Sequence, residues 1–249
     1  MTRQRLDVVL AESHAVASRH QAQQVIASGM VRVNGRLALK PSQIIQDGDD
    51  VVVDAESWVS RGAHKLLGAL DDCGMTVPGR CLDAGASTGG FTQVLLARGA
   101  TRVYAVDVGH GQMAPQVASD PRVAVMEGVN LKDLRLQDLD GVPVGLAVAD
   151  LSFISLTAVL PALLPLIEPS GHALLLVKPQ FEVGREELPS SGVVRDDGQR
   201  RAAVDNVAAA ASALGWSERW RGPSHLPGAH GNVEFFLLLG ECSTTLSTG

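Results

Sequence analysis

Hydrophobic and polar positions near the start of the chain follow first a helical and then a strand period. Leu6, Val9 and Leu10 are spaced i, i+3, i+4, which predicts a short helix with one apolar face. The tetrapeptide Ser18-Arg19-His20-Gln21 matches a capping box and predicts the start of a second helix. Gly29 can adopt the left-handed conformation that ends such a helix.

A strand pattern follows these two helices. Val31-Arg32-Val33 alternates as a half-buried strand does, and Asn34-Gly35 is a strong hairpin-turn sequence. Gly48-Asp49 introduces a further strand at Val51 to Val53. Two short helices and a hairpin form a small module with a marginal core of its own.

The pattern changes after residues 54–60, which we predict to be a linker carrying the aromatic Trp58. Apolar strand segments there alternate with helical stretches, which predicts a mainly parallel α/β sheet covered on both faces. An Ala-rich stretch from Val193 to Ala213 is predicted to be one helix. Strands are expected at Arg80–Asp83, Arg102–Asp107, Val123–Met126, Leu146–Asp150, Ala173–Lys178 and Glu234–Leu239.

Composition narrows the class of protein. The 249 residues are 45% hydrophobic, enough for a large domain plus a small one. The most apolar stretch, Leu151 to Ile167, contains polar residues and prolines, so we expect a strand and a Pro-interrupted helix there and no membrane span. The start of the chain lacks a signal-peptide pattern, and three scattered cysteines predict neither a disulfide framework nor a zinc site. We therefore expect a cytoplasmic protein without a metal site.

Charge is distributed unevenly along the chain. The formal net charge is −6, which argues against nonspecific nucleic-acid binding by the whole surface. Residues 1–40 nevertheless hold six basic and two acidic residues, a net of +4, which leaves −10 for the remainder. Such a basic segment is either a phosphate-binding patch or an ordinary solvated face.

The strongest chemical pattern is Cys-Leu-Asp-Ala-Gly-Ala-Ser-Thr-Gly-Gly-Phe-Thr at residues 81–92. A strand ends at Asp83, a glycine-rich loop follows, and a helix is predicted to start near Phe91. Glycines allow backbone to approach a ligand closely, and a helix start offers free N–H groups. The next strand ends in Asp107, whose carboxylate can accept hydrogen bonds from both hydroxyls of a ribose.

Three interpretations of this loop compete. A dinucleotide site requires G-x-G-x-x-G, but Ser87 occupies the place of the second glycine. A purely structural glycine turn is the second possibility. The third is favoured, because an acidic residue two places before the first glycine resembles the first motif of S-adenosylmethionine-dependent methyltransferases. The resulting donor-binding candidates are Asp83, Gly85, Ala86, Ser87, Gly89, Gly90, Phe91, Asp107 and, after the third strand, Asn130, which is equally explained as a turn residue.

Charged residues also occur at the ends of the later strands. Asp150 ends the fourth strand, Lys178 ends the fifth, and Glu234 opens the last, while Lys65 lies in the helical run before the first strand. Taken singly, each has an ordinary explanation as a cap, a strand end or a solvated residue. Together they resemble the Lys-Asp-Lys-Glu tetrad of the FtsJ-like ribose 2′-O-methyltransferases, with Lys65, Asp150, Lys178 and Glu234 in the four catalytic places.

The basic segment resembles the S4-type RNA-binding module in its order of features, from RLDVVL through SRHQAQQVIASGMVRVNG to DGDDVVV. The resemblance implies an RNA-binding domain at residues 1–56, a linker at 57–60 and a methyltransferase domain at 61–249. It also implies RNA contacts by Arg3, Arg5, Arg19, Arg32 and Arg36.

The module together with SRGAHKL, LDAGASTGGFT, ADLSFIS, LVKPQFE and GNVEFF resembles the TlyA family over essentially the whole chain. Members of that family methylate cytidine 2′-hydroxyls in ribosomal RNA, and many carry the older label hemolysin. The resemblance implies a Rossmann-like, mainly parallel seven-stranded sheet, S-adenosylmethionine as cofactor and ribosomal RNA as partner. Ser57 departs from the family, which usually has a basic residue there.

The chemistry is consistent with this resemblance. Transfer from a sulfonium is an in-line displacement that requires alignment, and a ribose hydroxyl must lose its proton. A lysine whose pKa is lowered by burial and by a second lysine can accept that proton. We predict this role for Lys178, with Lys65 assisting and Asp150 and Glu234 positioning the amines. The alternatives are a nucleobase methyltransferase, a membrane-active toxin and a non-catalytic RNA-binding assembly factor.

Overall fold

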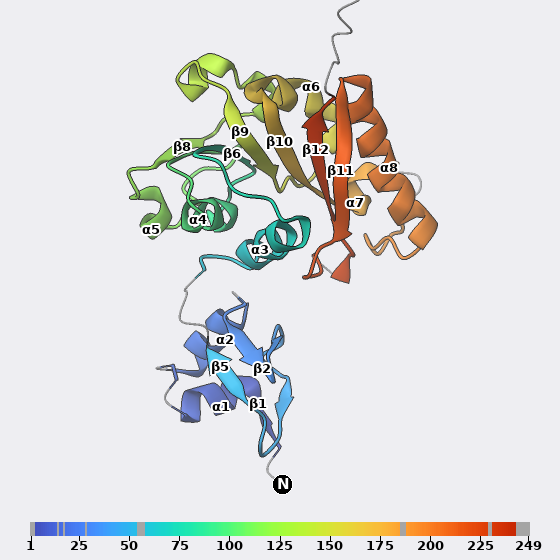
Figure 1. Cartoon of the computed structure of the whole chain (residues 1–249). Helices are drawn as coiled ribbons and strands as arrows, with labels where there is room; N and C mark the ends of the chain where they lie inside the picture. Colours follow the sequence, from blue (N-terminus) through green and yellow to red (C-terminus); the bar gives the residue numbers. More distant parts are fainter. Residues whose placement is uncertain are drawn as a thin grey trace, which may run out of the picture. The chain divides into compact units, whose positions relative to one another are not determined.

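The computed structural model describes residues 3–13, 15–16, 18–27, 29–53, 58–184, 188–228 and 231–242. The chain divides into two compact units, residues 1–64 and 65–249 (Figure 1). The sequence placed the linker at residues 57–60. Of these, Ser57 lies outside the described residues and Trp58 is buried.

The N-terminal unit confirms the two predicted helices and the hairpin. Ser18 Oγ accepts a hydrogen bond from the Gln21 N–H at 3.1 Å, as the capping sequence predicts. Asn34 and Gly35 both have positive φ, which is the turn geometry expected between β2 and β3. The elements are β1 (Gln4–Arg5), α1 (Leu6–Glu12), α2 (Arg19–Ala27), β2 (Val31–Val33), β3 (Arg36–Leu37), β4 (Ile44–Ile45) and β5 (Val51–Val53).

Pairing within this unit completes a small core. β2 lies between β3 and β5, and β1 pairs with β4 in a separate two-stranded ladder that the sequence pattern did not predict. Leu6 and Leu10 of α1 pack with Ala22 and Ile26 of α2, all almost fully buried. The apolar stripes read from the sequence therefore face each other.

The second unit contains a seven-stranded sheet in the order β11-β12-β10-β9-β6-β7-β8. Its five strands from β10 to β8 are parallel, and β12 is antiparallel to both β10 and β11. The predicted fold class is confirmed. The strands are β6 (Arg80–Ala84), β7 (Arg102–Asp107), β8 (Val123–Glu127), β9 (Val144–Ala149), β10 (Ile167–Val177), β11 (Trp216–Pro223) and β12 (Phe235–Glu241).

Helices cover this sheet. α8 packs on β10, β11 and β12, and α4 packs on β6 and β7 (Figure 1). The central strands are buried on both faces, as their continuous apolar runs require. The helices are α3 (Gly62–Cys73), α4 (Gly90–Ala97), α5 (Pro115–Ala118), α6 (Leu160–Leu163), α7 (Pro179–Glu182) and α8 (Asp197–Ala213), with 3₁₀ turns η1 (Leu131–Asp133), η2 (Leu136–Leu139), η3 (Leu156–Ala158) and η4 (Leu164–Leu166).

Three predictions about these elements were wrong in detail. The polar strand β11 was not among the predicted segments, because an edge strand lacks a continuous apolar run. α8 begins at Asp197, since the Asp196 side chain caps it by accepting the Gln199 N–H at 2.8 Å. Residues 151–166 contain a loop and short helical turns instead of a strand, and prolines break the helical part into α6 and η4. Over the described residues, no helix is both long and apolar enough to cross a membrane.

Candidate active site

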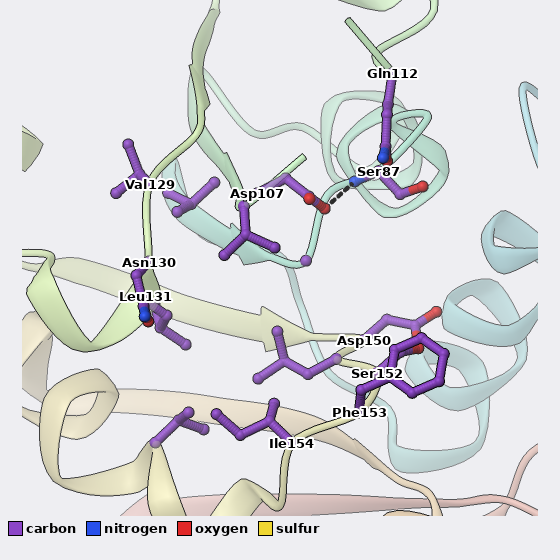
Figure 2. A pocket seen from close by; sticks show the side chains of 15 residues that line it. Ser87, Asp107, Gln112, Val129, Asn130, Leu131, Asp150, Ser152, Phe153 and Ile154 are labelled. Atoms are coloured by element: carbon purple, nitrogen blue, oxygen red, sulfur yellow. Dashed lines mark hydrogen bonds between the residues drawn. The ribbon is translucent and has the colours of Figure 1, made fainter. Parts of the chain in front are cut away.

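A pocket of about 430 Å³ opens where β6, β7 and β9 end (Figure 2). Ligand sites of open parallel sheets lie at this edge, outside the carboxyl ends of the strands. Four of the predicted donor-binding residues line it, together with the predicted catalytic Asp150. The lining is Gly85, Ser87, Val106, Asp107, Val108, Gln112, Val129, Asn130, Leu131, Asp150, Leu151, Ser152, Phe153, Ile154 and Val159.

The loop after β6 depends on Gly85. Gly85 has φ +83°, and a Cβ there would lie 2.6 Å from the backbone oxygen of Asp150. The N–H of Asp150 in turn donates to Ala84 O at 3.0 Å. Only glycine allows the ends of β6 and β9 to approach this closely. Ser87 then adopts φ +46°, an uncommon conformation for a residue with a side chain.

Asp107 is fixed by backbone donors on both of its oxygens. The Ser87 N–H donates to Oδ2 at 2.8 Å (Figure 2). The Gly109 N–H donates to Oδ1 at 2.7 Å. Each carboxylate oxygen retains a second lone pair. The group is therefore preorganised at the pocket wall and can still accept hydrogen bonds from a diol.

Asp83 is fully buried beneath the loop. Strand alternation places it on the opposite face of the sheet from Leu82 and Ala84, where Thr92 Oγ1 of α4 donates to its Oδ2 at 2.6 Å. Its Oδ1 has no hydrogen-bond partner among the described residues. Burial raises the pKa of Asp83 to about 7, with further contributions from the negative charges of Asp150 and Asp107.

This raised pKa predicts a pH-dependent stability. Because folding raises the Asp83 pKa from 3.8 to about 7, the folded state binds the proton more tightly, so the free energy of unfolding falls as pH rises from about 4 to 7. Asp83→Asn should remove this fall, which amounts to at most about 1.4 kcal/mol per pH unit. Thermal denaturation of the ligand-free chain across this pH range measures it, with exposed Asp133→Asn as control. An unchanged pH slope in Asp83→Asn would contradict the assignment.

The predicted tetrad forms two ion pairs at neighbouring strand ends. Lys178 Nζ lies 2.6 Å from Asp150 Oδ1, and Lys65 Nζ donates to Glu234 Oε2 at 2.6 Å. The strand register brings the pairs together. Val177 is opposite Phe235 in the β10–β12 ladder, so Lys178 and Glu234 are the next residues on adjacent strands, which lie about 5 Å apart.

Each pair has further contacts. Lys178 Nζ donates to Ser152 Oγ at 3.0 Å and lies 5.9 Å from the centre of the Phe181 ring. A Cβ at Gly228 would overlap the Glu234 carboxylate, at 1.9 Å from Oε1, so glycine at 228 leaves room for that side chain. Both Glu234 and Lys178 are nearly buried.

Five of the donor-binding candidates do not line the pocket: Asp83, which is buried beneath the loop, and Ala86, Gly89, Gly90 and Phe91. Gly89 is the N-cap of α4, and a Cβ on it would meet Val117 and Met113. Phe91 is buried and stacks on Phe236 of β12 with ring centres 6.2 Å apart. Direct contact of Ala86, Gly89, Gly90 and Phe91 with a ligand therefore stays a prediction, and their observed contribution is to the shape of the loop. Asn130 both lines the pocket and caps η1, by accepting the Lys132 N–H at 3.1 Å.

Sequence reasoning missed part of the pocket. Val108 and Gln112 come from the loop after β7, and Glu127 fixes that loop by accepting N–H groups of residues 111–113. Ser152 and Phe153 come from the loop after β9. The signal in the sequence was an apolar residue, Val108, directly after the strand-end carboxylate Asp107. In the structure the Val108 side chain is 68% exposed. Among the described residues, no group of three or more His, Cys, Asp or Glu could hold a metal ion.

The basic residues of the N-terminal unit are arranged around a carboxylate that the sequence did not single out. Asp7 is fully buried and accepts hydrogen bonds from Arg5, Arg19 and Gln23 at 2.9–3.1 Å. The Arg5 guanidinium, helped by Gln23 and Arg19, holds the pKa of Asp7 far below its usual range. Arg3 and Arg36 are exposed, and Arg32 is half-buried on β2.

Comparison with known proteins identifies the family. The family profile of FtsJ-like methyltransferases matches residues 58–241, and that of the S4 domain matches residues 4–51. The chain is 49% identical over 241 residues to the 16S/23S rRNA (cytidine-2′-O)-methyltransferase TlyA of Mycobacterium tuberculosis, covering 95% of this chain and 90% of that one. It is 37% identical to Hemolysin A of Brachyspira hyodysenteriae over 93% of this chain and 97% of that one.

A solved structure of a related protein has the same fold. The hemolysin-named protein of Streptococcus thermophilus superposes with a TM-score of 0.73 at 37% identity, covering 98% of this chain and 90% of that one. The order of the strands, the pocket at their carboxyl ends and the two lysine–carboxylate pairs are thus found in a chain that aligns with these proteins along nearly its whole length. The chain belongs to the TlyA family of FtsJ-like methyltransferases with an N-terminal S4 domain.

Proposed function

We propose that the chain transfers a methyl group from S-adenosylmethionine to the 2′-hydroxyl of a cytidine in ribosomal RNA. The observation that carries this proposal is the Lys178–Asp150 pair at the rim of the pocket, next in register to Glu234 and its partner Lys65. The relative from M. tuberculosis is named for the same transfer to 16S and 23S rRNA, which supports the acceptor.

The charge of the pocket favours this donor over a dinucleotide. Asp107 and Asp150 line the pocket, and Asp83 lies buried beneath its loop. These carboxylates suit a ligand with a sulfonium and an ammonium group and disfavour a pyrophosphate. Asp107 would hold the ribose hydroxyls, while Val108, Leu131 and Ile154 offer apolar contacts for an adenine ring. The Asp83 Oδ1 that lacks a partner is a polar atom that such a donor, or a water beside it, would satisfy.

Lys178 would handle the proton of the acceptor. When bound, the donor supplies a methyl group on a positively charged sulfur, which is a good electrophile. The ribose oxygen would bond to that methyl as the sulfur–carbon bond breaks, and the amine of Lys178 would accept the hydroxyl proton. Asp150 keeps the amine at the pocket rim, and Glu234 holds Lys65 for the neighbouring phosphate or ribose.

The S4 domain would bind structured RNA and bring the enzyme to ribosomal subunits in the cytoplasm. We assign residues 1–56 to RNA binding and residues 61–249 to methyl transfer, joined by residues 57–60. Arg3, Arg5, Arg19, Arg32 and Arg36 are the proposed RNA contacts. Arg5 and Arg19 would act from fixed positions, because buried Asp7 binds both.

The test separates a ribose acceptor from a base acceptor. Purified protein is incubated with labelled donor and ribosomal subunits, and 2′-O-methyl positions are mapped on the RNA. Substitution of 2′-deoxycytidine at the modified position should abolish labelling, because the accepting oxygen is then missing. Labelling that persists on the deoxy substrate would mean a nucleobase methyltransferase. Leakage of liposomes caused by the protein without donor would instead support a membrane-active toxin.

Arg36→Glu tests the division of labour between the two domains. Arg36 is exposed and has no contact with Asp7, so its reversal should leave the domain folded, whereas Arg19→Glu would place two carboxylates together. We expect weaker RNA binding and a slope of log affinity against log salt that is smaller by about 1. Donor affinity measured by calorimetry should not change. Loss of donor affinity in this variant would show that the assigned division is wrong.

A further inference from the structure

We infer that Ser152 is a positioning residue for methyl transfer, in that its hydroxyl orients the amine of Lys178 toward the acceptor. This inference rests on the proposed function and adds a fifth residue to the tetrad. Among the described residues, Lys178 has polar contacts with Asp150 and Ser152.

The two polar contacts of Lys178 differ in kind. Asp150 Oδ1 is only 2.6 Å from Nζ, yet it accepts no hydrogen bond among the described residues, so the contact is a close ion pair without hydrogen-bond alignment. Ser152 Oγ, at 3.0 Å, accepts the hydrogen bond of the amine. The carboxylate thus attracts the charge, and the hydroxyl fixes the direction of one N–H.

Direction matters because the amine is free to rotate. The Cε–Nζ bond of a lysine turns easily, and its N–H positions are equivalent until one is bound. A hydrogen bond to Ser152 fixes one position and leaves the others directed away from it. A proton acceptor works only within hydrogen-bond reach and with its lone pair aligned, so this restriction favours the productive arrangement.

Two hydrogen bonds to Glu182 fix the end of the loop that carries Ser152. At its end, Ser155 Oγ donates to Glu182 Oε2 at 2.6 Å, and the Leu156 N–H donates to Glu182 Oε1 at 2.8 Å. Glu182 belongs to α7, the helix that begins directly after Lys178. The loop and the lysine are therefore attached to the same short helix.

A second contact lies in the middle of the loop, where the Phe153 side chain is 92% exposed. Phe153 adopts φ +65°, which is uncommon for a bulky residue, and its ring centre lies 5.2 Å from that of Phe181 in α7. Ser152 lies between these restraints and the start of the loop, where the Asp150 N–H is bound to Ala84 O. Its side chain is exposed, so the hydroxyl contributes little to the packing of the fold.

The experiment compares Ser152→Ala with Ser152→Thr on the full chain and ribosomal RNA. Ser152→Ala should lower kcat about tenfold, the value of one hydrogen bond, with KM for RNA within twofold of the wild type. Because Ser152 also lines the pocket, the variants are compared at saturating donor concentration. Ser152→Thr retains a hydroxyl and should recover most of the rate. An unchanged kcat in Ser152→Ala, or a threonine variant as slow as alanine, would overturn the inference.

Ser155→Ala is the matched control, because it removes a hydroxyl from the same loop without touching Lys178. That variant loses one of the two hydrogen bonds from the loop to Glu182 and keeps the one from the Leu156 N–H, so kcat should fall less than in Ser152→Ala. A tenfold loss in Ser155→Ala would assign the effect to the loop as a whole and overturn the role of Ser152. If the wild-type chain itself does not methylate ribosomal RNA, the proposed function fails first, and the two failures are thereby distinguished.

Discussion

Lys178→Ala is expected to reduce methyl transfer by about 10²- to 10⁴-fold, the range that removal of a general base causes. The lysine follows β10 directly, is nearly buried, and has its polar contacts with Asp150 and Ser152 at the pocket rim. Donor affinity should change little, since Lys178 is not among the residues that line the pocket. Incorporation of a labelled methyl group into ribosomal RNA measures the rate, and calorimetry measures donor binding.

Lys178→Arg distinguishes proton acceptance from positive charge. Arginine keeps the charge beside Asp150 but stays protonated at all accessible pH values, so it should be nearly as inactive as alanine. Lys132→Ala, which removes an exposed lysine from η1, serves as the matched control and should be fully active. Substantial activity in the arginine variant would mean that the residue acts as a cation and does not accept the proton.

Gly85→Ala is expected to have the largest effect on donor binding of any single methyl addition in the loop. The new Cβ would lie 2.6 Å from Asp150 O and 3.0 Å from a methyl carbon of Leu151, at φ +83°. Backbone strain of about 1–3 kcal/mol and overpacking of similar size should together lower the free energy of unfolding. Separation of the two strand ends should also weaken donor affinity more than tenfold. Thermal denaturation and calorimetry measure the two effects.

Gly74→Ala provides the matched control for strain alone. Gly74 has φ +65°, but a Cβ there meets nothing within 4 Å. This variant should show the smaller strain cost and unchanged donor affinity. If Gly85→Ala bound the donor as well as Gly74→Ala does, the close approach of β6 and β9 would not be what forms the pocket.

The residues of the catalytic tetrad illustrate what a sequence can and cannot predict. The motifs place Asp150, Lys178 and Glu234 at strand ends, and parallel strands bring their carboxyl ends to one edge. The choice of partner is not encoded locally, because Lys65 and Glu234 are 169 residues apart in the chain. Only the antiparallel register of β12 against β10 sets Glu234 beside Lys178.

The side-chain contacts that the sequence did not show share a physical reason. Asp7 contributes an ordinary negative charge to the composition, yet two arginines from β1 and α2 converge on it in the fold. Phe91 opens a helix after a glycine-rich loop, a place typical of ligand contact, but its ring turns to Phe236 of β12. Side-chain direction depends on what packs against an element, and periodicity does not report that.

The sequence by itself determined the class of fold, the order of the main elements and the chemical types of the residues at the site. The reason is that hydrophobic periodicity, glycines and capping residues determine local structure within a few neighbouring residues. The tertiary structure alone decided which carboxylate faces which lysine, that Ser152 binds the amine of Lys178, and which loop residues line the pocket. These outcomes depend on contacts between segments far apart in the chain, which form only when strand register and helix packing fix the distances between them.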